Sequence, residues 1–191
     1  MDPYTILKGL SVAAIPLLLA IIFHEIAHGW VANRLGDPTA KQMGRLTINP
    51  VAHIDIFGTV IMPIILFVFS NGNFSFGYAK PVPVNPFNLR NPKRDMAIVS
   101  FAGPATNIIL AAISILFALI VAALRISPLL PQFLSSTLLV PISQMLSFSV
   151  TINIFLAAFN LIPIPPLDGG RVLTGVLPDR YAYSFSKIEP Y

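Results

Sequence analysis

The segment Ile6–Val31, ILKGLSVAAIPLLLAIIFHEIAHGWV, decides the fold of this chain. A membrane-spanning helix needs about 20 mainly apolar residues, and this segment is apolar over that length. Its second half carries His24, Glu25 and His28. Because ionisable side chains are costly inside a bilayer, their presence there marks a functional site. The segment therefore predicts a membrane helix that carries chemistry.

The composition extends this conclusion to the whole chain. Of its 191 residues, 55% are hydrophobic and 10% are charged, with a mean hydropathy of +0.76. A soluble domain carries about 25% charged residues, so this chain needs lipid to solvate much of its surface. We therefore expect a multi-pass protein of the cell membrane, with the lipid bilayer as a partner.

The net charge of +4 does not indicate a nucleic-acid partner, because the Lys and Arg residues are spread over the connections between apolar segments. Basic connections beside apolar spans are attracted to anionic lipid headgroups. The chain has no cysteine, which excludes disulfides and thiolate metal sites.

Three further segments are apolar enough to lie in a membrane: Ile56–Phe69, which is short and contains Pro63, Met96–Leu124 and Leu138–Ile162. We therefore predict an all-α polytopic membrane protein with about four membrane segments. Residues 1–191 are expected to form a single membrane-embedded domain. The basic residues on either side of Ile56–Phe69 nearly balance if that segment spans, so the orientation stays open.

The most polar connection, Asn71–Arg94, has a different character. Its centre, Phe74–Pro86, alternates Val and Pro. Alternating Val and Pro cannot form the interior of a helix, and the pattern favours extended or edge-strand backbone. We expect a short extended or β loop region there, near the active site.

The spacing of His24-Glu25-Ile26-Ala27-His28 is typical of a metal site. Residues four apart lie on one face of a helix, about 5–6 Å apart at Cβ, so both imidazoles can reach one zinc ion. Glu25 is then placed to take a proton from the attacking water, the arrangement H-E-x-x-H. We predict His24 and His28 as ligands of one Zn²⁺ per chain and Glu25 as the catalytic base.

A catalytic zinc site needs a third protein ligand, for which there are two candidates. Asp168 follows the proline-rich segment Asn160–Leu167, whose irregular backbone must face protein or a water-filled cavity at membrane depth. His53 is the rival, although it fits an ordinary interfacial histidine. The sequence favours Asp168.

Asn107, four residues after Gly103 in the third apolar segment, has two interpretations. It can hydrogen-bond between helices beside a close-packing glycine. It can also donate to the oxyanion that forms when water attacks a carbonyl, which would make it catalytic.

These motifs together resemble the site-2 protease family of intramembrane zinc metalloproteases, in a compact prokaryotic-type form. The resemblance rests on five stretches in the family's order: His24–His28, Asn49–Thr59, Gly77–Pro83, Ala102–Asn107 and Asn160–Gly169. It implies that Asp168 is the third zinc ligand and that Glu25 is the catalytic base. It further implies a membrane-protein substrate cut in or near its transmembrane helix. Similar proteins usually continue past Tyr191 into another hydrophobic helix, so the sequence is expected to be shortened at its C-terminus.

The second class of function is a metal-ion or proton transporter or channel, in which His, Glu and Asp side chains would form a path for the ion. This interpretation explains the apolar composition equally well. It gives no reason for two histidines four residues apart with a glutamate between them.

Overall fold

The computed structural model describes residues 3–70, 79–127 and 131–186, and the regular structure of these ranges is helical throughout. The all-α fold class predicted from the sequence is confirmed for this part of the chain. In chain order the helices are α1 (Pro3–Leu35), α2 (Thr39–Gln42), η1 (Pro50–His53), η2 (Ile56–Ile61), α3 (Met62–Phe69), η3 (Pro86–Asn88), α4 (Pro92–Arg125), α5 (Gln132–Leu134), η4 (Ser135–Leu139), α6 (Val140–Asn160), α7 (Asp168–Val176) and α8 (Asp179–Ser186).

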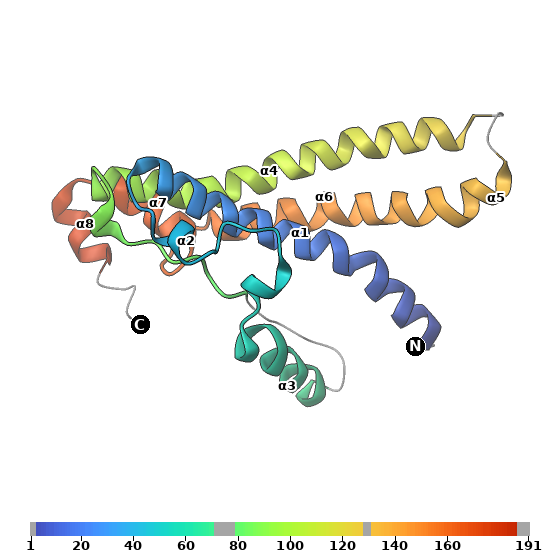
Figure 1. Ribbon diagram of the computed structural model, residues 1–191, viewed down its shortest axis with the longest axis horizontal. Coiled ribbons are helices and arrows are strands. Elements are labelled where there is room, and N and C mark those ends of the chain that lie inside the picture. Colours follow the sequence, from blue (N-terminus) through green and yellow to red (C-terminus); the bar gives the residue numbers. More distant parts are fainter. Residues whose placement is uncertain (1–2, 71–78, 128–130, 187–191) are drawn as a thin grey trace.

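Three of these helical stretches are long and apolar enough to cross a membrane: Ser11–Leu35, Pro92–Arg125 and Gln132–Asn160. They pack side by side as α1, α4 and α6, with α4 running back along α1 and α6 returning along α4 (Figure 1). The C-terminal end of α1, the start of α4 and the end of α6 therefore meet at one end of the bundle. The short helices α7 and α8 lie at that same end.

The outward faces of the long helices are apolar. Along α4, Leu116 and Leu119 are 59% and 64% exposed, and only 22% of the most apolar stretch of this helix is buried within the protein. A water-soluble protein rarely exposes apolar surface so continuously. The chain is therefore a membrane protein whose helices face lipid.

The second apolar segment does not form a full span. It folds as η2 and α3, which together reach about 21 Å at 1.5 Å per residue, whereas the hydrocarbon core is about 30 Å thick. The segment also returns to where it started, because the Lys80 N–H donates to the His53 carbonyl over 2.9 Å. Of the four expected membrane segments, three are therefore spanning candidates, and the second projects beside the bundle as α3 (Figure 1).

The predicted extended loop region is only partly visible. Residues 79–85 are non-helical, as the prolines require, but they form no strand. The rest of that prediction, Phe74–Tyr78, lies outside the described residues. The non-helical stretch crosses the end of the bundle where α1 ends and α4 begins, which brings it to the predicted site.

Candidate active site

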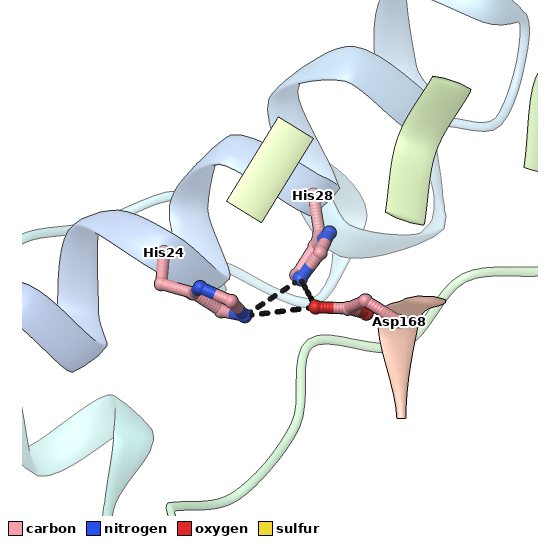
Figure 2. Close-up of side chains that lie close together, drawn as sticks. All are labelled: His24, His28 and Asp168. Carbon is pink, nitrogen blue, oxygen red and sulfur yellow. Dashed lines mark hydrogen bonds and ion pairs between the residues drawn. The ribbon is translucent and has the colours of Figure 1, made fainter. Parts of the chain in front are cut away.

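The three predicted metal ligands meet at the end of the bundle. His24 and His28 point the same way from α1, and Asp168 reaches them from the first residue of α7 (Figure 2). The Nε2 atoms of the two histidines are 3.0 Å apart. Oδ2 of Asp168 lies 3.2 Å from Nε2 of His24 and 3.3 Å from Nε2 of His28. Residues separated by more than 130 positions thus place three donor atoms in one triangle.

The size of this triangle fits zinc. Ligands held at about 2.0–2.1 Å from one ion in a tetrahedral site lie about 3.3 Å from one another. The observed separations are 3.0–3.3 Å. Oδ2 of Asp168 is moreover buried without a hydrogen-bond donor. Three electron-rich atoms this close need a cation between them.

The other ring nitrogen of each histidine fixes the tautomer. Nδ1 of His24 donates to the side-chain oxygen of Asn107 over 2.6 Å, and Nδ1 of His28 donates to the carbonyl of Val99 over 2.7 Å. Because both partners are acceptors, the proton stays on Nδ1 and the Nε2 lone pair is free for the metal. Such partners orient metal-binding histidines and raise their basicity.

A glycine on α4 makes room for the histidine pair. A Cβ placed on Gly103 would lie 2.4 Å from Nε2 of His28 and 2.6 Å from Cε1 of His24. Gly103 and Asn107 are four residues apart, so they lie on one face of α4. On that face Gly103 leaves space for both imidazoles, and Asn107 orients the imidazole of His24.

The turn between α6 and α7 sets the place of Asp168. Pro163, Pro165 and Pro166 end the helical run after Asn160, and the chain turns back against the first residues of α7. A Cβ on Gly169 would lie 2.3 Å from the Leu161 carbonyl oxygen, so only glycine permits this approach. A carboxylate binds a metal in its ionised form. With the histidine protons on Nδ1, the two Nε2 lone pairs and Oδ2 of Asp168 face one another.

The predicted base lies in the same cavity. Glu25 lines a space of about 310 Å³ together with His24, His28 and Asp168. Its Oε2 accepts the Val82 N–H over 2.7 Å, so the non-helical stretch 79–85 orients the carboxylate from across the cavity. One carboxylate, that of Asp168, would thus hold the metal, and a second, that of Glu25, lines the same cavity outside the set of ligands.

The stretch 79–85 is itself held near both of its ends, at Lys80 and Asn85. Nη2 of Arg45 donates to the Lys80 carbonyl over 2.6 Å. Asp37, which is fully buried, accepts the Asn85 N–H over 2.7 Å and an Asn88 amide N–H over 2.9 Å. Burial raises the pKa of Asp37, but the donors from Thr39, Asn88 and Asn85 outweigh it and lower the pKa below its ordinary value.

The structure separates the two candidates for the third ligand. His53 is buried away from the triangle, and its Nε2 contacts the Thr47 carbonyl at 2.8 Å. Asp168 joins His24 and His28 in the described residues' one group of His and acidic side chains close enough to share a metal. The choice of Asp168 over His53 thus agrees with the geometry.

The contacts of Asn107 show a positioning role. Besides accepting from His24, its amide nitrogen donates to the Ala20 carbonyl over 3.1 Å and to Asn153 over 2.9 Å. Both amide hydrogens are therefore engaged. Its catalytic role as an oxyanion donor stays a prediction.

Sequence reasoning missed several residues that build the site. Spacing gave a signal for Gly103, which precedes Asn107 by one helical turn. Nothing in the sequence identified the Val82 N–H or the Val99 carbonyl, because every residue carries such groups and only the fold decides which ones meet a catalytic side chain. Asp37 lies in Gly36-Asp37-Pro38, a sequence typical of a turn, and this pattern does not predict its contacts with Asn85 and Asn88.

Two histidines four apart and a glutamate on the membrane helix α1, with an acidic third ligand on α7, are the residues expected of a membrane zinc metalloprotease. The comparisons with known proteins agree. Residues 12–187 match the model of peptidase family M50, and the chain belongs to this family. The chain is a zinc metalloprotease, and Zn²⁺ is its cofactor.

The relatives are bacterial and archaeal. "Putative zinc metalloprotease YwhC" of Bacillus subtilis is 35% identical over 177 residues, which cover 93% of this chain and 74% of the relative. "Putative zinc metalloprotease Rip2" of Mycolicibacterium smegmatis is 28% identical, over 80% of this chain and 52% of the relative. "Zinc metalloprotease MJ0392" of Methanocaldococcus jannaschii is 24% identical, over 91% and 36%. The chain thus spans about half or less of the latter two relatives. No solved structure matches significantly.

Proposed function

We propose that this protein hydrolyses peptide bonds in or near the transmembrane segments of membrane-protein substrates. The observation that carries the proposal is the depth of the metal site. His28 lies seven residues before the end of α1 at Leu35, which is about 10 Å along the helix axis. A peptide bond that reaches His24, His28 and Asp168 would then lie inside the length of the candidate span Ser11–Leu35, not beyond its end.

The residues around the cavity have separate tasks. Zinc, when bound, supplies a Lewis acid that polarises a carbonyl and makes water acidic enough to lose a proton at neutral pH. His24, His28 and Asp168 would hold it. Glu25 accepts the proton of the attacking water and returns it to the leaving amine. The Val82 N–H orients the carboxylate of Glu25 for both transfers, and Asn107 holds the ring of His24 in place.

The substrate has to enter as an unwound segment, because a helix engages its own backbone groups. Strand addition along residues 74–84 is one way to bind it. Within the described part, however, Pro81 and Pro83 have no N–H, and the N–H groups of Lys80 and Val82 already donate to His53 and Glu25. Pairing of this kind would therefore rely mainly on residues 74–78, which lie outside the described residues.

We further propose a multi-pass arrangement in the cell membrane with the metal site at the cytoplasmic end. The connection through α3 returns to its origin, so the cations on both sides of it lie at one end of the bundle. Positively charged connections stay in the cytoplasm. The elements at the site end carry nine cations: Arg34 at the end of α1, Arg90, Lys93 and Arg94 at or just before the start of α4, Lys41 of α2, Arg171 of α7, Arg180 of α8, and Arg45 and Lys80, which are hydrogen-bonded to each other beside α2. Lys8 and Arg125 belong to the opposite ends of α1 and α4.

The decisive experiment is cleavage by the purified, zinc-loaded chain in lipid vesicles, offered a panel of labelled single-span membrane peptides. The unmodified protein should cut a subset of the panel within the span. Glu25→Gln should retain one zinc per chain and lose cleavage, since it removes the base and keeps all three ligands. Glu189→Gln, the same change at the chain's other glutamate, is the matched control and should cleave normally.

The same vesicles test the transporter alternative. A zinc carrier would move metal into a vesicle that encloses a zinc-sensitive dye, whether or not a peptide is present. Zinc flux that depends on Glu25, with no peptide cut, would reject the protease proposal. The membership of peptidase family M50 favours cleavage.

A further inference from the structure

A second, larger cavity adjoins the one at the metal. It has a volume of about 580 Å³ and lies between the stretch 79–85, the start of α4 and the helix α7. Five residues line both cavities: Pro81, Val82, Val84, Met96 and Arg171. The two spaces are therefore parts of one groove, with the metal site at its inner end, and we call the larger space the outer cavity.

The charges along this groove change sign. The metal cavity is lined by the acidic side chains Glu25 and Asp168, whereas the ionisable residues that line the outer cavity are Lys93 and Arg171. Lys93 is engaged at the rim, because its ammonium donates to Asp179 and to the Leu177 carbonyl, both over 2.6 Å. Arg171 also has a partner within the protein, but its guanidinium carries five N–H groups, so one partner leaves donors for another. Unlike Lys93, it lines both spaces and stands where the groove passes from one to the other.

The position of Arg171 follows from the helix that supplies the metal ligand. Asp168 and Arg171 are three residues apart on α7, so their side chains leave neighbouring positions on one helix face. Gly175 packs this helix closely on α4, since a Cβ there would lie 2.3 Å from that of Ala97. The guanidinium is thus carried by a helix whose place is fixed at both ends, by the metal ligand and by close packing.

The wall opposite Arg171 is apolar and irregular. It consists of Pro81, Val82, Val84 and Pro86, with Met96 of α4 beside them. Such a wall accepts the side chains of an extended apolar peptide and offers no charge of its own. A carboxylate on that peptide would find one cationic partner at the junction and an apolar surface elsewhere.

We propose that Arg171 is a specificity-determining residue that binds an acidic side chain of the substrate in the outer cavity. One helical turn separates it from Asp168, and an extended chain advances about 3.3 Å per residue. With the reach of the arginine side chain, the acidic residue stands about two to four residues from the scissile bond. A guanidinium binds a carboxylate through paired, charge-assisted hydrogen bonds, which a neutral amide of the same shape cannot match.

This inference rests on the proposed function and is tested by binding as well as by cleavage. The probes are fluorescent 20-residue apolar peptides with one aspartate placed at each of several positions, and twins with asparagine in its place. The full-length Glu25→Gln protein, zinc-loaded in uncharged detergent micelles, binds without cutting. The dissociation constant of each peptide is measured by fluorescence anisotropy.

The expected result depends on the charge of the peptide. Arg171→Gln should weaken the best aspartate peptide about tenfold and its asparagine twin less than twofold, a difference typical of a charge-assisted hydrogen bond. Arg171→Glu should prefer a lysine peptide at the same position. Arg125→Gln, the same change at the far end of α4, is the matched control and should alter neither constant. Zinc content close to that of the parent shows that each variant is folded.

Three outcomes would overturn the proposal. Equal weakening of aspartate and asparagine peptides by Arg171→Gln would make the role structural. Weakening that appears only after anionic lipid is added would assign Arg171 to a lipid phosphate. An unchanged constant, with slower release of the cut product, would assign it to the new C-terminal carboxylate. The two proposals can fail separately. If the unmodified protein cuts none of the peptides, the protease proposal fails. If binding still depends on both Arg171 and the aspartate, the assignment of Arg171 to an acidic side chain in the outer cavity is retained.

Discussion

The close approach between Gly103 and the histidine pair gives the sharpest prediction. Gly103→Ala adds one carbon 2.4 Å from Nε2 of His28 and 2.6 Å from Cε1 of both His24 and His28. Ordinary contacts begin at about 3.4 Å, so the imidazoles have to move by about 1 Å. Neither ring can yield freely, because Nδ1 of each is hydrogen-bonded to α4 itself, at Asn107 and Val99.

A shift of this size is large on the scale of metal coordination, where ligand distances hold to about 0.2 Å. Loss of a partner behind a ligand costs about 10–100-fold in affinity. Since Gly103→Ala displaces the ligands themselves, we expect zinc to bind at least about 100-fold more weakly, or about 2.7 kcal/mol. Cleavage should fall with it.

The assay is competition for zinc with a chelator of known affinity, followed by elemental analysis of the detergent-purified protein. Gly9→Ala is the matched control, because it is also a glycine of a long helix and a Cβ there meets nothing within 4 Å. Gly175→Ala is a second control that crowds Ala97 and no histidine, so its folded fraction should keep normal zinc affinity. If Gly103→Ala holds zinc as tightly as the parent, the account of the α4 face is wrong.

Three further predictions follow from the contacts around the site. Asn107→Leu should weaken zinc about 10–100-fold by removing the acceptor for His24, while Asn107→Asp keeps it; an oxyanion role alone would leave zinc unchanged in both. Asp37→Asn should destabilise the protein by about 1–3 kcal/mol above pH 3.8, where the carboxylate is ionised folded and unfolded. Because the folded pKa of Asp37 is lowered, this difference should disappear as pH falls through that lower pKa, in denaturation measured across pH. The chain has no native cysteine, so in intact cells a membrane-impermeant maleimide should label Arg125→Cys and spare Lys41→Cys; the reverse pattern would refute the orientation.

The sequence predicted the parts of the site that depend on local spacing. Two histidines one helical turn apart and a glutamate beside them fix a face of α1 whatever the rest of the chain does. The long apolar segments predicted the bundle for a similar reason. In lipid a single segment can satisfy its own backbone hydrogen bonds only as a helix. Local spacing could not predict Asp168 as a ligand. The proline-rich segment Asn160–Leu167 before it supplied the signal.

The sequence did not predict what depends on the return path of the chain. Composition alone left open whether Ile56–Phe69 crosses the membrane or dips in without crossing. The hydrogen bond from the Lys80 N–H to the His53 carbonyl shows that the chain on its two sides meets. The role of Asn107 was left between two alternatives for the same reason. Its partners Ala20 and Asn153 lie 87 and 46 residues away, so no local pattern reveals them.

The site is built from two sets of contacts that scarcely overlap. The zinc ligands are placed by α1, α4 and α7, and their supports, Asn107 and Val99, belong to α4. The base is oriented by the Val82 N–H, on a stretch that Arg45 and Asp37 hold from beyond the end of α1. The orientation of the metal ligands therefore depends on contacts with α4, whereas the orientation of Glu25 depends on the stretch 79–85. That stretch also forms one wall of both cavities, so the residues that orient Glu25 are the same ones that line the groove leading to the metal site.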